Sequence, residues 1–140
     1  MSAEIEFTNP DSVASPLGLY SHSVKVPGGA ELFYFSGQLG IAKDGHCPET
    51  IGEQADLVFA NIVSLLEDNK MTVGNLVKLT TFMVDGHSGE AVRAARLKHL
   101  GDHRPASTAV YVSRLVDPAW FVEVEAVAAR TAPAEGGGQC

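Results

Sequence analysis

The sequence predicts a single α+β domain in which two helices cover one face of a mixed β-sheet. Residues 107–114 and 121–129 alternate between two faces with the period of two that is typical of strands. Between residues 54 and 69, apolar side chains recur at helical spacing and form a stripe suited to packing on a sheet. A chain of 140 residues has room for one such domain, which we expect over residues 1–131.

Three strands are expected before the first helix. A short strand at residues 5–7 is followed by turn-forming residues. Residues 20–26 and 31–36 flank a Pro-Gly-Gly turn at 27–29, and this arrangement predicts a β-hairpin. Residues 37–53 contain scattered glycine, proline and aspartate without a sustained period, which indicates a long loop.

After the helix at 54–69, the chain changes between strand and helix once more. Residues 72–75 indicate a turn, and residues 76–84 are rich in the side chains typical of a strand. A second helix is expected over residues 90–100, with an acidic first turn and Gly101 as its stop. With the two C-terminal strands, the predicted order is β-β-β-α-β-α-β-β.

The composition favours a partly covered surface and argues against nucleic acid as a partner. Hydrophobic residues make up 45% of the chain and charged residues 19%, so part of the surface is expected to lie against partner subunits. The formal net charge is -7, whereas proteins that bind a phosphate backbone usually present a basic patch or stripe.

Cysteine usage and hydropathy indicate the cytoplasm. Cys47 and Cys140 have neither a disulfide framework nor metal-like spacing, so both are expected to be free thiols in a reducing compartment. The N-terminus lacks the pattern of a signal peptide, and no segment approaches the ~18 to 20 apolar residues that span a bilayer. Residues 132–140, which include three consecutive glycines, are expected to be a disordered tail.

Three histidines lie close together in number but are not expected to bind a metal. His87, His99 and His103 fall in a loop, at a helix end and in another loop. No pair therefore has the i, i+4 arrangement on one helix that would support ligation. We expect structural roles for them, and we expect no metal and no cofactor.

The strand predicted at 121–129 carries its carboxylates in an unusual place. One face presents Glu123 and Glu125 between Phe121 and Val127, while the other face is wholly apolar. We do not expect a face of this composition to be plain solvent-exposed surface. It is therefore a candidate for function or assembly.

Several short motifs occur in an order that matches a known family. They are Gly18-Leu19-Tyr20-Ser21-His22, Phe35-Ser36-Gly37-Gln38-Leu39, Gln54-Ala55 with Asn61, Val77-Lys78-Leu79-Thr80-Thr81-Phe82, Pro105-Ala106-Ser107-Thr108 and the Val-Glu-Val-Glu-Ala-Val-Ala run at 122–128. Together they resemble the signature of the Rid/YjgF family, the reactive intermediate deaminases once named endoribonucleases. The resemblance spans about residues 4 to 131.

The resemblance implies both an assembly and a chemistry. It implies a chorismate-mutase-like fold that assembles as a homotrimer. It also implies a pocket at each subunit interface that binds a small imine or enamine derived from an amino acid. Water converts this ligand to the keto acid with loss of ammonia.

The same resemblance implies roles for particular residues. Glu123 aligns with the family's catalytic glutamate, which orients or deprotonates the attacking water. Ser107 stands where the family's Pro-Ala-Arg motif has its carboxylate-binding arginine. Arg104 is a poor replacement, because in an extended chain its odd offset points it to the opposite face. Arg93 falls near an asparagine that contacts ligand in many members, and Arg96 follows one turn later.

Tyr20 and Gly37 complete the pocket that the resemblance implies, and each candidate also has a plainer interpretation. Glu123 could form an ion pair across a subunit boundary, and Tyr20 could be a half-buried aromatic of the sheet. Arg93 could be a solvated charge. Gly37 could be present only for a positive φ angle.

Hydrolytic deamination of imines or enamines is the leading functional hypothesis. With a neutral hydroxyl at the anchor, we expect weak hydrolysis of 2-imino acids and a gain on Ser107→Arg. Loss of that arginine favours the alternative, a non-catalytic member that binds a small ligand or a protein partner through the same pocket. RNA cleavage ranks last because of the net charge.

Overall fold

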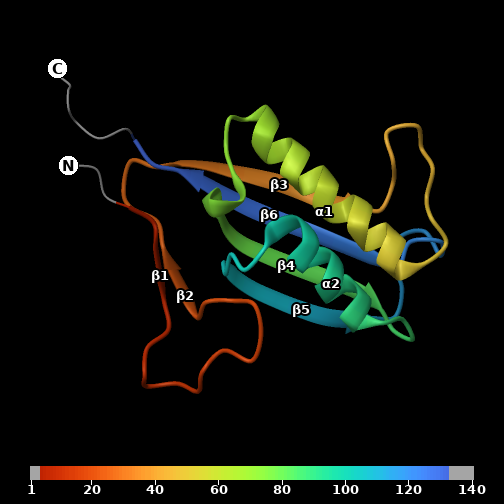
Figure 1. Cartoon of the computed structure of the whole chain (residues 1–140), viewed down its shortest axis with the longest axis horizontal. Coiled ribbons are helices and arrows are strands. Elements are labelled where there is room, and N and C mark those ends of the chain that lie inside the picture. The colour runs from red at the N-terminus through yellow and green to blue at the C-terminus, as the bar shows by residue number, and fades with distance from the viewer. Residues whose placement is uncertain (1–3, 133–140) are drawn as a thin grey trace.

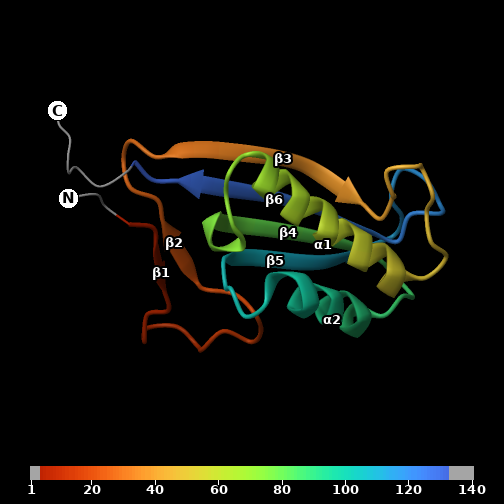
Figure 2. The same ribbon diagram turned by 45° about the horizontal axis from the view of Figure 1, so that its top comes forward.

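A computed structural model describes residues 4–132 and shows a helical layer packed on a β-sheet (Figure 1, Figure 2). The elements in chain order are β1 (Glu6–Thr8), β2 (Ser23–Lys25), β3 (Glu31–Leu39), α1 (Ile51–Asp68), the 3-10 helix η1 (Val73–Asn75), β4 (Leu76–Val84), α2 (Gly89–Leu100), β5 (Ala106–Val112) and β6 (Val122–Arg130). The predicted order of strands and helices is confirmed. The tail expected at 132–140 lies, from residue 133 on, outside the described residues.

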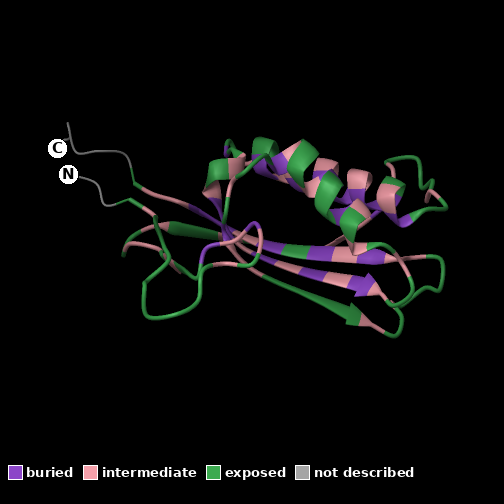
Figure 3. Cartoon of the chain, turned by 60° about the horizontal axis from the view of Figure 1, so that its bottom comes forward, coloured by how far each residue is buried: buried purple, intermediate pink, exposed green. Residues whose placement is uncertain are grey.

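The main sheet has four strands in the order β3-β6-β4-β5. β6 pairs antiparallel with both β3 and β4, while β4 and β5 are parallel and are joined through α2, so the sheet is mixed as predicted. Figure 3 shows both helices on one face of this sheet and, among residues 4–132, no helix or further sheet over the other face. We call the second face, which carries Tyr34, Glu123 and Glu125, the open face.

The hairpin predicted from residues 20–26 and 31–36 is wrong. The turn itself forms, because Ala30 N–H donates to the Pro27 carbonyl at 3.4 Å. However, β2 pairs with β1 in a separate two-stranded sheet, and β3 pairs with β6. The alternation of side chains identifies a strand but does not specify its partner.

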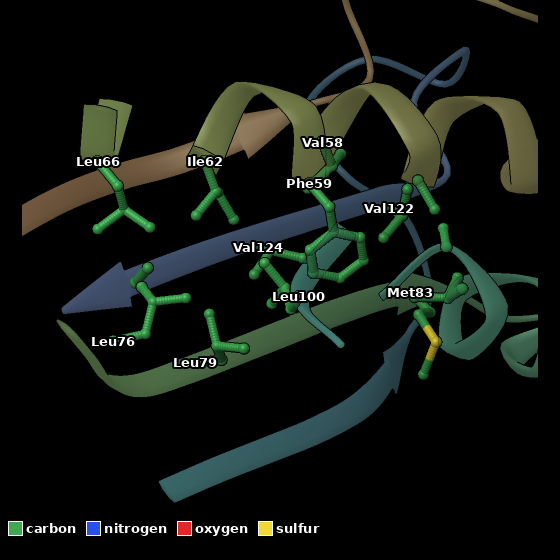
Figure 4. Packing of buried hydrophobic residues seen from close by; sticks show 14 of the residues in the cluster. Val58, Phe59, Ile62, Leu66, Leu76, Leu79, Met83, Leu100, Val122 and Val124 are labelled. Atoms are coloured by element: carbon green, nitrogen blue, oxygen red, sulfur yellow. The ribbon is translucent and has the colours of Figure 1, made fainter. Parts of the chain in front are cut away.

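The core lies between the helices and the sheet (Figure 4). Its α1 members recur at helical spacing, and its β6 members come from every second position of that strand. β4 contributes Leu76, Leu79 and Met83, with a register shift between Leu76 and Lys78. The largest apolar side chains that are almost fully buried are Phe59, Ile62, Leu66, Leu76, Leu79, Val58, Val122 and Val124. The wholly apolar face of 121–129 is thus the one turned inward.

The first helix begins at Ile51, before the predicted start at residue 54. Thr50 is its N-cap, and the Thr50 hydroxyl accepts a hydrogen bond from the Glu53 backbone N–H at 3.2 Å. Thr50 Oγ1 also lies 2.9 Å from Glu53 Oε1. A Thr-x-x-Glu sequence is a helix-start signature, so this boundary was encoded in the part of the sequence interpreted as loop.

Gln54 connects two loops to the buried side of α1. Its side-chain Nε2 donates to the carbonyls of Pro48 and Ala119, each at 2.9 Å, and its Oε1 accepts from Phe121 N–H at 2.8 Å. This amide is completely buried and has partners for both its nitrogen and its oxygen. It therefore holds the chain in place immediately before Glu123.

In the part of the chain that the structure describes, neither helix combines the length and hydrophobicity needed to cross a bilayer.

Candidate functional site

A cavity of about 420 Å³ lies between α2, the strands β4 and β5, and the segment that precedes β2. This volume falls within the range of small-molecule sites. Apolar side chains such as Phe59, Met83 and Val92 form much of its wall. The segment 17–20 borders it on another side, so the cavity is built from parts of the chain that are distant in sequence.

Three of the five predicted site residues line this cavity, namely Tyr20, Arg93 and Ser107. The Tyr20 hydroxyl accepts a hydrogen bond from Leu17 N–H at 3.1 Å, which folds the 17–20 segment back on itself. Tyr20 lies in this loop and not in a strand, because β2 starts only at residue 23. Its interpretation as a sheet aromatic is therefore wrong.

Arg96 also lines the cavity and contacts Ser107 directly. It extends from α2, and its Nη2 donates to Ser107 Oγ at 3.3 Å and to the Leu19 carbonyl. Its Nε is buried and has no hydrogen-bond partner. Burial lowers the pKa of the Arg96 guanidinium to about 10, and the nearby positive charges of Arg93 and Arg104 act in the same direction.

These three arginines form a cationic cluster without an acidic partner. Within residues 4–132, no salt bridge involves Arg93, Arg96 or Arg104. Arg104 donates from Nη1 to the Gly18 carbonyl at 3.4 Å, so it stands at the edge of the same segment that borders the cavity. The cluster is thus positioned to attract an anion.

Glu123 lies on the other side of the sheet from this cavity. In the strand register, Glu123 is opposite Phe82, whereas Ser107 is opposite Leu79. Leu79 is buried under the helices. Phe82 lies three positions further along β4, so its side chain points to the opposite face of the sheet. Ser107 therefore faces the helices with Leu79, and Glu123 faces the other side with Phe82. Within one chain, therefore, Ser107 and Glu123 cannot line the same pocket.

Gly37 is the fifth predicted site residue and lies against Glu123. A Cβ atom placed on Gly37 would stand 2.8 Å from Glu123 Cδ, so any side chain there would displace the carboxylate. Gly37 is not among the glycines with positive φ. The interpretation of Gly37 as a positive-φ residue is wrong, since the close approach of Glu123 accounts for it.

The three histidines each have a separate structural partner. His87 stacks on Phe121 with the ring centroids 4.1 Å apart, and His103 Nε2 lies 2.9 Å from the Leu76 carbonyl oxygen. His99 Nε2 is 2.8 Å from Asp56 Oδ1, which links α2 to α1. Among the described residues, no group of three or more potential ligands is placed to hold a metal ion.

The sequence interpretation noted Arg96 only as a neighbour of Arg93 and did not include it among the site residues. A signal was present, because Val92, Ala95, Arg96 and Leu100 follow the i, i+3, i+4, i+8 spacing of a buried helix stripe. Val92, Ala95 and Leu100 are indeed buried. A charged residue inside such a stripe indicates a buried cation that needs a partner.

Comparison with known proteins agrees with this architecture. Residues 11–130 match the family model described as Endoribonuclease L-PSP. The chain belongs to this Rid/YjgF family. A RutC family protein of Pyrococcus abyssi is 30% identical to it over 135 residues, which cover 91% of this chain and 98% of that protein.

Other relatives share the fold of this Rid-family chain. The crystal structure of a Rid-family protein of unknown function from Yersinia pestis, YyfB, superposes with a TM-score of 0.78 at 24% identity, covering 89% of this chain and 97% of that one. Escherichia coli TdcF, named as a candidate reactive intermediate deaminase, is 26% identical over 105 residues, 72% of this chain and 81% of TdcF. A crystal structure of TdcF with bound serine superposes with a TM-score of 0.66 at 23% identity, covering 89% and 98% of the two chains.

Proposed function

We propose that this Rid-family protein hydrolyses small reactive imines or enamines to carbonyl compounds and ammonia. The observation that carries the proposal is the Glu123 carboxylate. By the resemblance of the run at 122–128, Glu123 aligns with the family's catalytic glutamate. Its side chain is partly buried and has no ion pair within the described residues. A carboxylate without an ion-pair partner is free to accept a proton from water.

The proposed reaction needs one water molecule and no cofactor. Glu123 takes a proton from that water while the oxygen attacks the imine carbon, and the imine nitrogen becomes an amine. The proton that makes the nitrogen an amine comes from solvent, and Glu123 then passes the water proton to this amine. The C–N bond breaks as the carbonyl forms, the hydroxyl proton returns to solvent, and ammonia leaves. An enamine first gains a proton on carbon to become the imine, after which the same steps follow.

We further propose that the site is completed between subunits of a homotrimer with the chorismate-mutase-like arrangement. The geometry supports this, because Ser107 and Glu123 face opposite sides of the sheet within one chain. β5 and β3 are the two edge strands, and they carry Ser107 and Gly37. If the β5 edge of one subunit approaches the β3 edge of the next, the neighbour's Glu123 faces the cavity.

The ligand is expected to be a small metabolite derived from an amino acid. The relative TdcF holds serine in its crystal structure, and the cavity of about 420 Å³ has room for a molecule of that class. We also retain the cytoplasm as the expected compartment.

Ligand binding without catalysis is the second candidate function. The observation that favours it is the cavity lining, in which no residue of the described chain carries a carboxyl group. If no neighbouring subunit supplies Glu123, the cavity has cations and hydroxyls but no general base. RNA cleavage is not favoured by a chain with a net charge of -7.

A carboxylate-to-amide substitution tests the proposal. Imines generated by an amino-acid oxidase are followed by ammonia release and by their disappearance against a trapping amine. We expect Glu123→Gln to lower kcat by about a hundredfold or more, as removal of a general base does. The matched control is Glu125→Gln, which removes the next carboxylate on the same face and should leave most of the rate. A native rate in Glu123→Gln would contradict the assignment, and no hydrolysis by the native protein would favour the ligand-binding candidate.

A further inference from the structure

We propose that Arg96 is the carboxylate anchor of the cavity, taking the place of the arginine that the family carries at the position of Ser107. The ligand it selects is a small 2-oxo or 2-imino acid with an apolar side chain. The assignment of a 2-imino acid substrate rests on the function proposed above. Binding of the carboxylate to Arg96 does not.

The Arg96 side chain is in direct contact with Ser107. Arg96 Nη2 lies 3.3 Å from Ser107 Oγ, so a guanidinium stands directly beside residue 107 although it comes from α2 and not from β5. The small Ser107 side chain leaves room for this approach. An arginine at 107 would bring a second guanidinium into the same space, so the two positions are alternatives for one cation.

The positive charge of Arg96 has no acidic partner within the described residues. Arg96 is a partly buried cation whose other polar neighbours are a hydroxyl and a carbonyl oxygen, and its Nε has no partner. Its charged neighbours, Arg93 and Arg104, are both positive. Burial of an unpaired charge is costly unless an opposite charge offsets it. The described chain supplies no carboxylate here, and the neighbour's Glu123 is proposed above to act on water, so a bound ligand is the natural source of the negative charge.

The wall of the cavity beyond Arg96 is largely apolar. An arginine fork matches the two oxygens of a carboxylate. Beyond the guanidinium, the cavity is walled by Phe59, Met83, Val92 and Ala109. These apolar groups favour a hydrocarbon side chain over a polar one, so the cavity suits an acid such as 2-oxobutanoate, which is also the product type of 2-imino acid hydrolysis.

The test is a direct binding measurement on the full chain, independent of turnover. Isothermal titration calorimetry with 2-oxobutanoate compares the native protein, Arg96→Met and Lys98→Met. Lys98 is a matched control, since it is a cation of the same helix whose partner is Asp56. We expect about a ten- to hundredfold loss of affinity in Arg96→Met, the loss typical of a charge-assisted hydrogen bond, and no loss in Lys98→Met. The neutral 2-oxobutanamide should bind weakly to all three.

A second pair of variants tests whether positions 96 and 107 exchange roles. Ser107→Arg in the Arg96→Met background should restore affinity for 2-oxobutanoate. In contrast to the gain expected from the sequence, Ser107→Arg alone should not raise affinity, because Arg96 already lies beside residue 107 and two guanidiniums then compete for one place. Arg96→Met with native affinity, or a large gain from Ser107→Arg alone, would overturn the proposal. If Arg96→Met fails to fold, Arg96→Gln replaces it, because glutamine removes the positive charge and can still donate a hydrogen bond; unchanged affinity in that variant would equally overturn the proposal.

The outcomes separate this inference from the proposed function. Arg96-dependent binding without imine hydrolysis leaves the anchor standing and defeats the deaminase. Imine hydrolysis with a KM that is unchanged in Arg96→Met leaves the deaminase standing and defeats the anchor.

Discussion

Gly37 and Arg96 show at the scale of single residues how one side chain sets the place of another. Gly37 leaves the space that the Glu123 carboxylate fills. Arg96 fills the space that the small Ser107 side chain leaves open. In both pairs, a small residue leaves the space in which the charged side chain lies. The positions of the Glu123 and Arg96 charges therefore depend on residues that are distant from them in sequence.

Gly37→Ala tests the first of these pairs. The added Cβ would stand 2.8 Å from Glu123 Cδ, so we expect the carboxylate to shift and imine hydrolysis to fall by about tenfold to a hundredfold in kcat. Overpacking should also cost about 1–3 kcal/mol of stability. Gly28→Ala is the control, because its Cβ meets nothing within 4 Å. Native kcat in Gly37→Ala would show that Glu123 is not held by this contact.

At the scale of elements, α1 and α2 are joined by a polar contact as well as by the core. Asp56 of α1 accepts a hydrogen bond from Lys98 at 3.1 Å and lies 2.8 Å from Nε2 of His99. The hydrogen bonds from His99 and then Lys98 hold the pKa of Asp56 below its ordinary value of 3.8. The contact therefore joins the two helices of the helical layer.

Asp56→Asn should change the pH dependence of stability. Because the pKa of Asp56 is lowered by folding, its contribution is fully present above pH 3.8 and is lost as the pH falls through the folded-state pKa. We expect a lower melting temperature than native at pH 7, with the difference shrinking below about pH 4. The side chain is 41% exposed, so the effect should stay within roughly 1 kcal/mol. Asp102→Asn, at an exposed turn residue, is the control. An equal fall in its melting temperature would show that the effect does not come from the contact of Asp56 with His99 and Lys98.

For the whole molecule, the open face is the surface on which the proposed assembly depends. Its edge strands expose Leu32, Tyr34 and Val110 by 48%, 74% and 41%. An uncovered sheet face with large apolar side chains is typical of an interface. The same face carries Glu123, so the proposed assembly and the proposed catalysis depend on one surface.

Tyr34→Glu should disrupt the trimer. A charge at the most exposed aromatic of the open face would have to be buried without a partner on assembly. Light scattering at micromolar concentration should give the mass of three chains for the native protein and of one chain for Tyr34→Glu. Leu97→Glu is the matched control, because Leu97 is an exposed apolar residue of α2, in the helical layer. A native protein with the mass of one chain would refute both the trimer and the interface site.

Much of the fold followed from local patterns in the sequence. The strand at 76–84 was predicted with its observed bounds, and the second helix began one residue earlier than predicted, at Gly89. The division of β6 into one wholly apolar face and one face with two carboxylates was also read from the sequence, and the structure buries the apolar face. These features depend on spacings of two and 3.6 residues, which any stretch of sequence displays by itself.

The pairing of strands and the composition of the cavity were decided only by the tertiary structure. The pairing of β2 with β1 and the contact of Arg96 with Ser107 both join different elements. The spacing of residues within one segment does not indicate which distant segment will lie beside it. The sequence by itself determined the family, the order of elements and the candidate residues. Tertiary packing decided that Ser107 and Glu123 face opposite ways, because each residue of a strand points to the side that its register assigns.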